Sequence, residues 1–246
     1  MAWSRKSVAG ARPGESRRIL TGLPSRSAQQ GGRPLTDEKP GTWETLFRRA
    51  LEIIDSAQSA GVTIEGWSFG GGTVLMRRHK HRLSKDIDIF LPDPQYLGHL
   101  TPRLNTIAES LTSNYVEQHG FVKLLFPEGE IDFVVAGHLT PEPVVKEIIL
   151  GREVMVETST EIVAKKVWYR GAEFTARDIF DLAMVAELEP QALETIAPVL
   201  RGRREEVLRR VKQQGQRLRE TFEQLETLDY QRSYDECLEI VMRALA

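Results

Sequence analysis

The first half of the chain alternates between helical and strand-like spacing of its hydrophobic residues. Apolar positions at three- and four-residue intervals predict a helix over residues 42–60, which Gly61 ends. Short apolar runs bounded by glycine or proline are typical of strands. We expect strands at residues 62–69, 83–91, 121–126, 131–135 and 153–156. Short helices are expected at residues 73–78 and 102–113, and the third and fourth strands are expected to form a hairpin.

The second half of the chain has helical spacing almost throughout. Three serine or threonine residues precede an acidic residue by three positions, which is the spacing of a capping box. These pairs are Thr158 with Glu161, Thr175 with Asp178, and Ser233 with Glu236. A long charged segment at residues 197–228 is also expected to be helical, with interruptions at two glycines. A mixed α/β part followed by a helical part predicts an α+β fold.

Composition narrows the class of protein without identifying a partner. The 246 residues are 28% charged, but the formal net charge of −2 neither favours nor excludes nucleic acid. The single cysteine, Cys237, excludes an internal disulfide and a CxxC metal site, and it fits a cytoplasmic protein. No run approaches the roughly 18 apolar residues of a membrane span, so no membrane partner is expected.

The N-terminal segment differs from the rest of the chain in composition. Up to residue 36, seven basic residues stand against one acid, Glu15, among serines, glycines and prolines. Such a segment cannot bury enough apolar surface to offset its ordering entropy, which predicts a disordered basic tail over residues 1–40. An organellar transit peptide and a basic arm for nucleic acid are the alternatives.

Two aspartates, Asp86 and Asp88, stand one residue apart in the strand expected at residues 83–91. Side chains at positions i and i+2 lie on the same face of a strand, so the two carboxylates project together. A divalent cation relieves their repulsion and takes oxygen ligands. Asp132, between two apolar residues of the expected hairpin, supplies a third carboxylate. Three such acids suit Mg²⁺, with Mn²⁺ as the alternative, in phosphoryl or nucleotidyl transfer.

A glycine turn precedes these aspartates. Gly70, Gly71 and Gly72 would let the backbone approach a phosphate closely. Thr73 adds a hydroxyl at the start of a helix, where free N–H groups favour anions. The glycines alone are equally typical of an ordinary strand-to-helix turn, and the aspartates alone of a solvated edge strand. Their closeness in the sequence favours a phosphate site beside a metal site.

A dense basic cluster lies between the glycine turn and the aspartates. Residues 77–82 hold three arginines, two histidines and a lysine. Such a cluster can hold phosphates or an RNA backbone, and a solvated loop is the alternative. The candidates for RNA contact are Arg77, Lys80 and Arg82. The arginines of residues 201–210 are interleaved with glutamates, which favours a solvated helix face there.

The same region resembles a motif of the AbiEii-type nucleotidyltransferase toxins, which are related to the MenT toxins. These toxins belong to the DNA polymerase β-like nucleotidyltransferase superfamily. The matching positions are Gly71, Gly72, Thr73, Arg78, His81, Arg82, Ser84, Asp86 and Asp88. A second block, a helical lysine followed by R-D-x-[YF]-D-L, matches at Lys166, Arg177, Asp178 and Asp181. The resemblance covers residues 61–188.

The resemblance implies a polymerase β-like sheet with flanking helices, NTP and Mg²⁺ chemistry, a tRNA 3′ end as acceptor, and a cognate antitoxin. It implies that the nucleotide is bound by Gly71, Gly72, Thr73, Arg78 and Lys166. Lys165 is the alternative to Lys166 if the helical register differs by one residue. Asp178 is expected to orient Lys166 or help bind the nucleotide, with capping of its own helix as the alternative.

We therefore expect a Mg²⁺-dependent nucleotidyltransferase toxin that acts on RNA. Residues 41–157 would form the nucleotidyltransferase domain, and residues 158–246 a helical region that completes the active site. The expected catalytic residues are Asp86, Asp88, Asp132, Lys166 and Asp178, of which the first three bind the metal. A phosphotransferase acting on a protein and a catalytically silent RNA- or protein-binding module are the alternatives.

Overall fold

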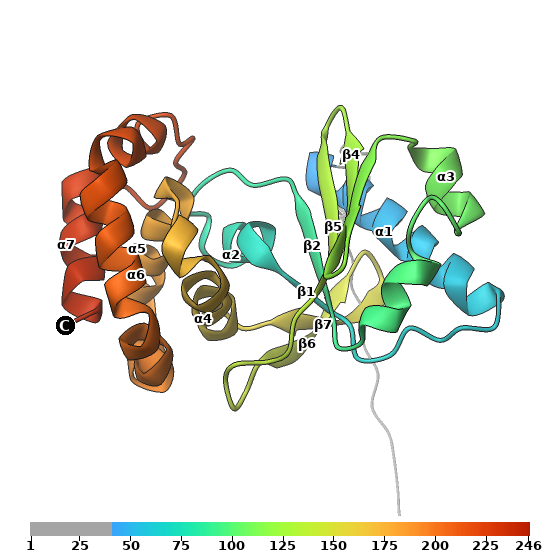
Figure 1. Ribbon diagram of the computed structural model, residues 1–246, viewed down its shortest axis with the longest axis horizontal. Coiled ribbons are helices and arrows are strands. Elements are labelled where there is room, and N and C mark those ends of the chain that lie inside the picture. Colours follow the sequence, from blue (N-terminus) through green and yellow to red (C-terminus); the bar gives the residue numbers. More distant parts are fainter. Residues whose placement is uncertain (1–40) are drawn as a thin grey trace, which may run out of the picture. The chain divides into compact units, whose positions relative to one another are not determined.

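A computed structural model gives the fold, and it describes residues 41–246. The basic tail expected at residues 1–40 lies outside the described residues. Seven strands form one mixed sheet in the order β3-β4-β5-β2-β1-β7-β6 (Figure 1). They are β1 Ser68–Gly70, β2 Ile87–Leu91, β3 Tyr115–Gln118, β4 Phe121–Phe126, β5 Gly129–Val135, β6 Val144–Ile149 and β7 Arg152–Glu157. The expected mixed α/β fold class is confirmed.

The centre of the sheet combines parallel and antiparallel pairs. Strand β2 runs antiparallel to β1 and parallel to β5, whereas β1 runs parallel to β7. The hairpin expected at residues 121–135 is present as β4 and β5. Because β5 lies directly beside β2, acids that are far apart in the sequence become neighbours across the sheet.

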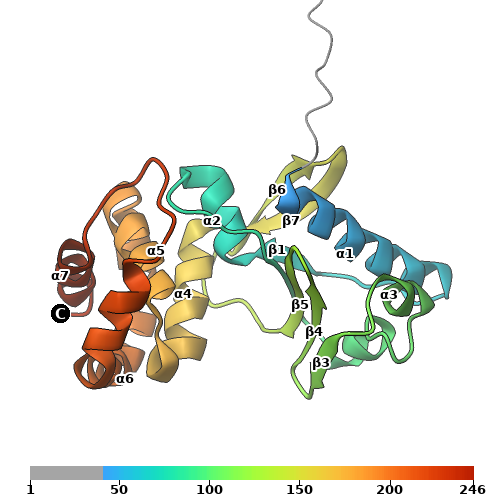
Figure 2. The ribbon, with the colours of Figure 1, turned by 90° about the horizontal axis from the view of Figure 1, so that it is seen from above.

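Helices surround this sheet and continue into the C-terminal half (Figures 1 and 2). The α-helices are α1 Thr42–Ser59, α2 Gly71–His79, α3 Thr106–Leu111, α4 Ser159–Arg170, α5 Ala176–Leu188, α6 Gln191–Phe222 and α7 Tyr234–Ala244. Short 3₁₀ turns occupy Pro94–His99 and Gly171–Glu173. Helix α4 packs against both α2 and α6, so it joins the sheet part to the C-terminal helices. Among the helices of residues 41–246, none combines the length and apolar character that a membrane crossing requires.

Two expected strands are shorter in the structure than in the prediction. The strand predicted at residues 62–69 is only Ser68–Gly70, because Gly66 adopts a positive φ of 68° just before it. The strand predicted at residues 83–91 begins only at Ile87. The segment before it pairs instead with the loop that precedes α7, where Leu83 N–H donates to the Glu226 carbonyl and Leu228 N–H donates to the His81 carbonyl.

Other predicted boundaries were wrong for identifiable reasons. The helix predicted at residues 102–113 is limited to Thr106–Leu111, with Asn105 as its N-cap. The long helix α6 starts earlier than predicted and is not interrupted by its glycines. A glycine costs only about 1 kcal/mol in a helix interior, and the buried stripe of α6 offsets this cost. That stripe includes Leu200, Val207, Leu218 and Phe222. Strands β3 and β6 were not predicted.

The capping boxes expected from the sequence begin three helices. Thr175 with Asp178 and Ser233 with Glu236 form both reciprocal hydrogen bonds. Thr158 caps α4 by accepting from the Glu161 N–H, but the Glu161 carboxylate does not return to Thr158. It accepts instead from the backbone N–H groups of Leu139 and Thr140. This contact ties the loop after β5 to the start of α4.

Candidate active site

Acidic side chains meet where β5, β2 and β1 lie side by side. In the parallel pair of β2 and β5, Asp88 is the register partner of Asp132. On the other side of β2, Asp88 is opposite Gly70 of β1. Asp86 lies one residue before β2 and shares the face of Asp88 by the two-residue period. The three aspartates expected as metal ligands are therefore brought to one region of the sheet.

The start of α2 approaches this region closely. Gly71 is the first residue of α2 and has a φ of 73°. A Cβ added there would lie 1.9 Å from Asp88 Oδ2. Gly71 thus permits both the left-handed backbone conformation and the approach of the helix to the carboxylate. The free N–H groups and positive dipole of a helix N-terminus favour anions at this point.

Substitution of Gly71 by alanine should disrupt the site. The left-handed backbone costs an L-residue roughly 1–2 kcal/mol, and the added methyl would displace the Asp88 carboxylate. We expect lower stability in urea unfolding together with a loss of the activity expected from the sequence. The control is Gly98→Ala, where an added Cβ meets nothing within 4 Å. Equal stability and activity of the two variants would contradict this role of Gly71.

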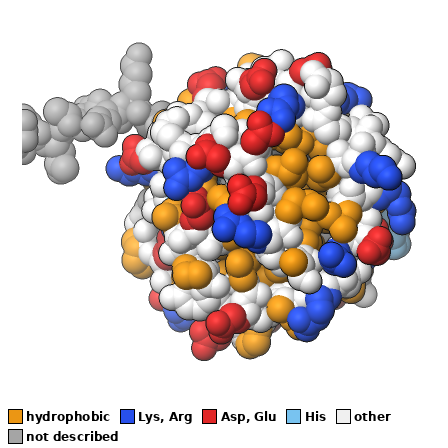
Figure 3. Space-filling model, turned by 90° about the vertical axis from the view of Figure 1, so that its left-hand side faces the viewer, with side chains coloured by type: hydrophobic (Ala, Val, Ile, Leu, Met, Phe, Trp, Pro, Cys, Tyr) orange, Lys and Arg blue, Asp and Glu red, His pale blue; other side chains and the backbone are white. Residues whose placement is uncertain are grey.

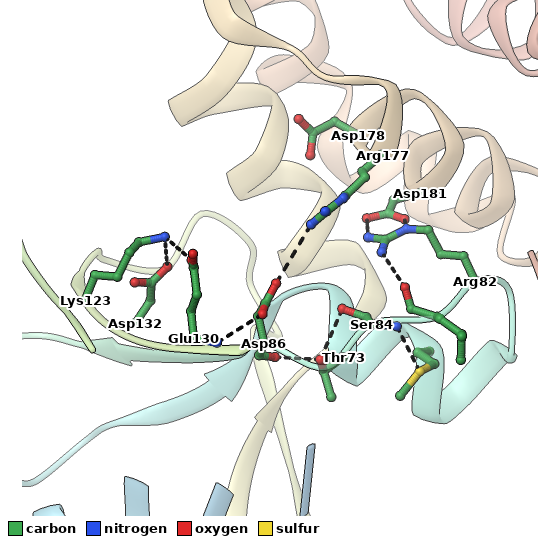
Figure 4. A network of polar contacts seen from close by, with 12 residues as sticks. Thr73, Arg82, Ser84, Asp86, Lys123, Glu130, Asp132, Arg177, Asp178 and Asp181 are labelled. Atoms are coloured by element: carbon green, nitrogen blue, oxygen red, sulfur yellow. Dashed lines mark hydrogen bonds and ion pairs between the residues drawn. The ribbon is translucent and has the colours of Figure 1, made fainter. Parts of the chain in front are cut away.

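Thr73 lies inside the protein instead of facing the cavity. Its side chain is 0% exposed, and its hydroxyl donates to the Asp86 carbonyl at 2.6 Å. The same hydroxyl lies 3.1 Å from Ser84 Oγ (Figure 4). The expectation that Thr73 binds the nucleotide is corrected: because its hydroxyl is buried and occupied, Thr73 fixes the backbone of Asp86 relative to α2. Ser84, by contrast, lines the cavity.

Helices α4 and α5 supply a lysine held by two aspartates. Lys166 Nζ lies 2.9 Å from Asp178 Oδ1 and 3.2 Å from Asp181 Oδ2. Burial alone would lower the pKa of Lys166, but the two carboxylates outweigh it and raise that pKa. Asp178 also caps α5 through Thr175, so its carboxylate contacts Lys166 and the start of its own helix at the same time. An ammonium group has three N–H donors, and two of them are used here.

Asp181 joins the loop before β2 to α5. Its carboxylate accepts from Arg82 Nε at 2.7 Å and from Arg82 Nη2 at 2.8 Å (Figure 4). It also lies 2.8 Å from His81 Nε2. Burial alone would raise the pKa of Asp181, but Arg82 and then Lys166 hold it well below its usual range. Arg82 is 3% exposed, so its predicted contact with RNA is corrected: the guanidinium is committed to an internal ion pair.

The other basic residues of the cluster lie away from the three aspartates. Arg77 Nη1 and Arg78 Nη2 both pair with Glu147 of β6, at 3.1 and 2.8 Å. Arg78 also donates to the Glu157 carbonyl. Neither arginine lines the cavity described below, because β6 and β7 hold their guanidinium groups. This position does not support Arg78 as a nucleotide-binding residue. Lys80 is exposed at the end of α2 and remains a predicted RNA contact.

Some charged residues of the site were not predicted from the sequence. Lys123 lies opposite Asp132 in the antiparallel pair of β4 and β5, with Nζ 3.1 Å from Asp132 Oδ2, and it also pairs with Glu130. Counting outward from the hairpin turn could have identified Lys123. Arg177 is 60% exposed and lies 3.8 Å from Asp86 Oδ2 (Figure 4). It stands in the second sequence block but was not assigned a role.

One cavity of about 410 Å³ is lined by the three aspartates together with Lys123, Lys166 and Arg177. One part of its lining is polar and includes Gly71, Gly72, Ser84, Asp86, Asp88, Asp132 and Lys166. Another part is apolar and includes Phe90, Val134, Ala136 and Ile162. A cavity that combines a few convergent charged groups with apolar walls is typical of a small-molecule site.

The charge balance of the three aspartates is suited to a cation. Burial and then Asp86 raise the pKa of Asp88, although Lys166 opposes the shift. Burial and then Asp88 raise the pKa of Asp132 to about 7. Asp132 Oδ1 is buried without a hydrogen-bond partner in the described part of the chain. A divalent cation would relieve this repulsion and supply the missing contact, so the residues fit a metal site.

A second cluster of possible metal-binding side chains lies outside the three aspartates. Within residues 41–246, His138, Glu157 and Glu161 are the acid and histidine side chains whose ligand atoms lie within 4.8 Å of one another. Lys165 Nζ lies 2.5 Å from Glu157 Oε1 and 3.6 Å from Glu161 Oε1. Glu161 is further occupied by backbone N–H groups. We therefore favour the aspartates as the metal site, because Lys165 and backbone N–H groups already occupy carboxylate oxygens of the other cluster.

The charged face of the C-terminal helices does not form one basic patch. Figure 3 shows acidic and basic side chains side by side there, together with exposed apolar side chains. Arg203 pairs with Glu206 at 2.8 Å, and Arg219 pairs with Asp235. This mixed distribution agrees with the solvated helix face expected from the sequence.

Comparison with protein families identifies one match. The sequence model described as "Nucleotidyl transferase AbiEii toxin, Type IV TA system" matches residues 59–244. This range includes the glycine turn, the three aspartates and the lysine of α4. A search of curated proteins found no match.

Several solved structures are similar to the chain. The antibiotic-resistance factor ANT(2″)-Ia has 18% sequence identity and a TM-score of 0.47, and the match covers 68% of this chain and 96% of that chain. A Helicobacter pylori structure described as a nucleotidyltransferase has 14% identity and a TM-score of 0.45, with coverages of 83% and 94%. The nucleotidyltransferase toxin MenT4 from Mycobacterium tuberculosis has 18% identity and a TM-score of 0.38, with coverages of 65% and 66%. Sequence identities and TM-scores this low do not assign a role to any residue of this chain.

Proposed function

Since the chain belongs to the AbiEii nucleotidyltransferase toxin family, we propose that it transfers a nucleotide from an NTP to the 3′ end of an RNA, with tRNA as the acceptor and Mg²⁺ as the metal. The observation that carries the proposal is the placement of Asp88 between Asp132 and the glycine-led start of α2. Membership of a toxin–antitoxin family implies a cognate antitoxin. NTPs and tRNA are both available in the cytoplasm, where we place the reaction.

The proposed reaction is a displacement at the α-phosphorus of the NTP. The RNA 3′-hydroxyl forms a bond to this phosphorus, the bond to the β-phosphate oxygen breaks, and pyrophosphate leaves. A divalent cation, when bound, neutralises phosphate charge and makes the attacking hydroxyl more acidic. Asp86 and Asp88 would hold it, with Asp132 as a third ligand. Asp132 Oδ1, which has no partner within the described residues, is alternatively placed to accept the hydroxyl proton.

The surrounding groups of the chain would position the triphosphate. Gly71 and Gly72 line the cavity at the start of α2, where the first N–H groups of a helix favour an anion. Lys166 has one donor left after its contacts with Asp178 and Asp181, and we propose that this donor binds a phosphate oxygen. Arg177, exposed beside Asp86, adds positive charge at the edge of the cavity.

Labelled nucleotides test the proposed reaction. The protein is incubated with Mg²⁺, total RNA and each NTP, labelled on either the α- or the γ-phosphate. We expect label on tRNA from an α-labelled NTP and none from the γ-labelled form. Label on protein from a γ-labelled NTP would instead indicate a phosphotransferase. RNA binding without any labelling would indicate a catalytically silent module.

Substitution of Lys166 by methionine should reduce transfer without unfolding the protein. Asp178 keeps Arg170 and Thr175 as partners, and Asp181 keeps Arg82 and His81. We expect kcat/KM to fall roughly tenfold to a hundredfold, from the about 1.5–3 kcal/mol of a hydrogen bond to a charged group.

Steady-state kinetics at fixed Mg²⁺, together with RNA binding, checks this prediction. The control variant is Lys146→Met, which removes an exposed lysine paired with Glu153 on the edge of the sheet. An unchanged kcat/KM for Lys166→Met, or an equal loss in RNA affinity, would show that Lys166 does not act on the nucleotide.

A further inference from the structure

Glu157 and Lys165 form a second charged group in the cavity. Glu157 is the last residue of β7, and both side chains line the cavity with the aspartates. Glu157 is 0% exposed and Lys165 is 5% exposed. Glu157 Oε1 accepts from Lys165 Nζ at 2.5 Å and from Ser68 Oγ at 3.1 Å. Glu157 Oε2 is buried and has no hydrogen-bond partner among the residues that the structure describes.

The strand register places Glu157 in the same row as the aspartates. Phe69 of β1 pairs with Val156 of β7, so the next residues, Gly70 and Glu157, are also neighbours. Gly70 in turn is opposite Asp88. Glu157 and Asp88 are thus separated by one strand that carries no side chain at this position. With adjacent strands about 4.8 Å apart, their backbones are roughly 10 Å apart, a distance comparable to the span of a nucleoside.

Gly70 leaves the space into which the Glu157 carboxylate extends. A Cβ on Gly70 would lie 2.3 Å from Glu157 Oε2 and 2.7 Å from the ring of Phe90. The unpartnered oxygen therefore lies in the space that Gly70 leaves, next to the Phe90 ring, and both Glu157 and Phe90 belong to the cavity lining. A buried carboxylate oxygen without a donor is costly, so a ligand that brings an N–H group to this point gains binding energy.

An apolar surface continues from the row of acids. Phe90 lies two residues after Asp88 on the same face of β2, and its register partner on β5 is Val134. Lys165 Nζ lies 4.0 Å from the centroid of the Phe90 ring. Ile162 and Tyr169 of α4 line the same cavity. Apolar and aromatic lining beside an acceptor and a donor suits a nucleobase, because bases stack on aromatic side chains.

We propose that Glu157 and Lys165 bind the nucleobase of the NTP and determine which nucleotide is transferred. The inference rests on the proposed function. Glu157 Oε2 accepts from an exocyclic amino group, and Lys165 donates to the adjacent ring nitrogen or carbonyl oxygen. The bases that carry such an amino group are adenine, cytosine and guanine. Uracil has no exocyclic amino group, and its single ring N–H lies between two carbonyl oxygens. Both oxygens would approach the Glu157 carboxylate, and acceptors repel each other. UTP is therefore expected to be the poorest substrate.

Nucleotide preference is the measurement that tests this proposal. kcat/KM for ATP, GTP, CTP and UTP is compared between the wild type, Glu157→Gln, and the double variant Glu157→Gln with Lys165→Met. We expect the wild type to use its preferred NTP at least about tenfold better than UTP, as expected when a hydrogen bond to a charged group is involved. We expect this preference to shrink by about tenfold in the variants.

The double variant removes both charges, and Glu161, the other buried partner of Lys165, keeps its hydrogen bonds from the Leu139 and Thr140 N–H groups, so it serves if the single variant fails to fold. Equilibrium binding of each NTP without RNA provides a readout that is independent of turnover. Inorganic triphosphate has no base, so it should bind the variants as tightly as the wild type. The matched control is Glu153→Gln with Lys146→Met, an exposed acid–lysine pair on β7 and β6 at 2.9 Å.

The outcomes separate this proposal from the proposed function. An equal loss for all four NTPs, a weaker binding of inorganic triphosphate, or a wild-type preference for UTP would overturn the base-reading role. A change in RNA acceptor preference with unchanged NTP preference would also overturn it. If the wild type transfers no nucleotide from any NTP, the proposed function fails, and NTP binding alone then decides whether Glu157 and Lys165 discriminate bases.

Discussion

Replacement of Asp88 by asparagine will abolish nucleotide transfer while the protein stays folded. Asp88 is the central acid of the row, in register with Asp132 and two residues after Asp86. Loss of a single active-site hydrogen-bond donor costs roughly 10²–10³ in kcat, and loss of the central acid of a metal site should cost at least as much. Burial and the neighbouring Asp86 raise the pKa of Asp88, so its charged form is unfavourable in the fold. The neutral variant should therefore be as stable as the wild type or more stable.

Asp86→Asn should give the same loss of transfer. The Asp86 side chain is 33% exposed and accepts from the Glu130 N–H at 3.2 Å, a contact that asparagine can keep. Transfer rates and melting temperatures are measured together, with and without Mg²⁺. We expect Mg²⁺ to raise the melting temperature of the wild type more than that of either variant. The control is Asp229→Asn, a substitution at an exposed aspartate in the loop before α7. Folded variants that retain most of the transfer rate would refute the metal assignment.

The largest stability effect is expected for Asp181→Ala. Asp181 is fully buried and pairs with Arg82, which is 3% exposed, and with His81. Removal of one partner of a buried ion pair leaves an uncompensated charge and costs about 3–5 kcal/mol. We therefore expect a strongly lowered free energy of unfolding in urea. Transfer should fall as well, because Asp181 holds the loop before β2 against α5 and contacts Lys166.

Asp235→Ala is the matched control for this variant. Asp235 also pairs with an arginine, Arg219, but the two side chains are 69% and 39% exposed. Exposed ion pairs contribute about 0–1 kcal/mol. If Asp181→Ala is no more destabilising than Asp235→Ala, the buried network does not hold the two parts of the site together. Asp181→Asn keeps the shape of the side chain, so its loss of unfolding free energy should be intermediate between those of Asp181→Ala and Asp235→Ala.

The sequence alone identified the features that depend on neighbouring residues. The two-residue period places Asp86 and Asp88 on one face, and this required no knowledge of the fold. The capping boxes at Thr175 and Ser233 were predicted because a cap involves residues three positions apart. The hairpin of β4 and β5 followed in the same way from two short apolar runs joined by a turn. These interactions are local, so residue spacing is sufficient to predict them.

The tertiary structure decided which of these residues are in contact and which have side chains already engaged in internal hydrogen bonds or ion pairs. Asp88 is next to Asp132 only because β5 returns parallel to β2, and Arg82 is paired with a carboxylate 99 residues away. The sequence shows that Thr73 has a hydroxyl, but only the fold reveals that this hydroxyl donates a hydrogen bond to the Asp86 carbonyl. Likewise, Lys165 and Lys166 are adjacent in the sequence and line the same cavity, yet they contact different carboxylates. Contacts between residues far apart in the sequence depend on how the whole chain folds, and the spacing of neighbouring residues does not specify such contacts.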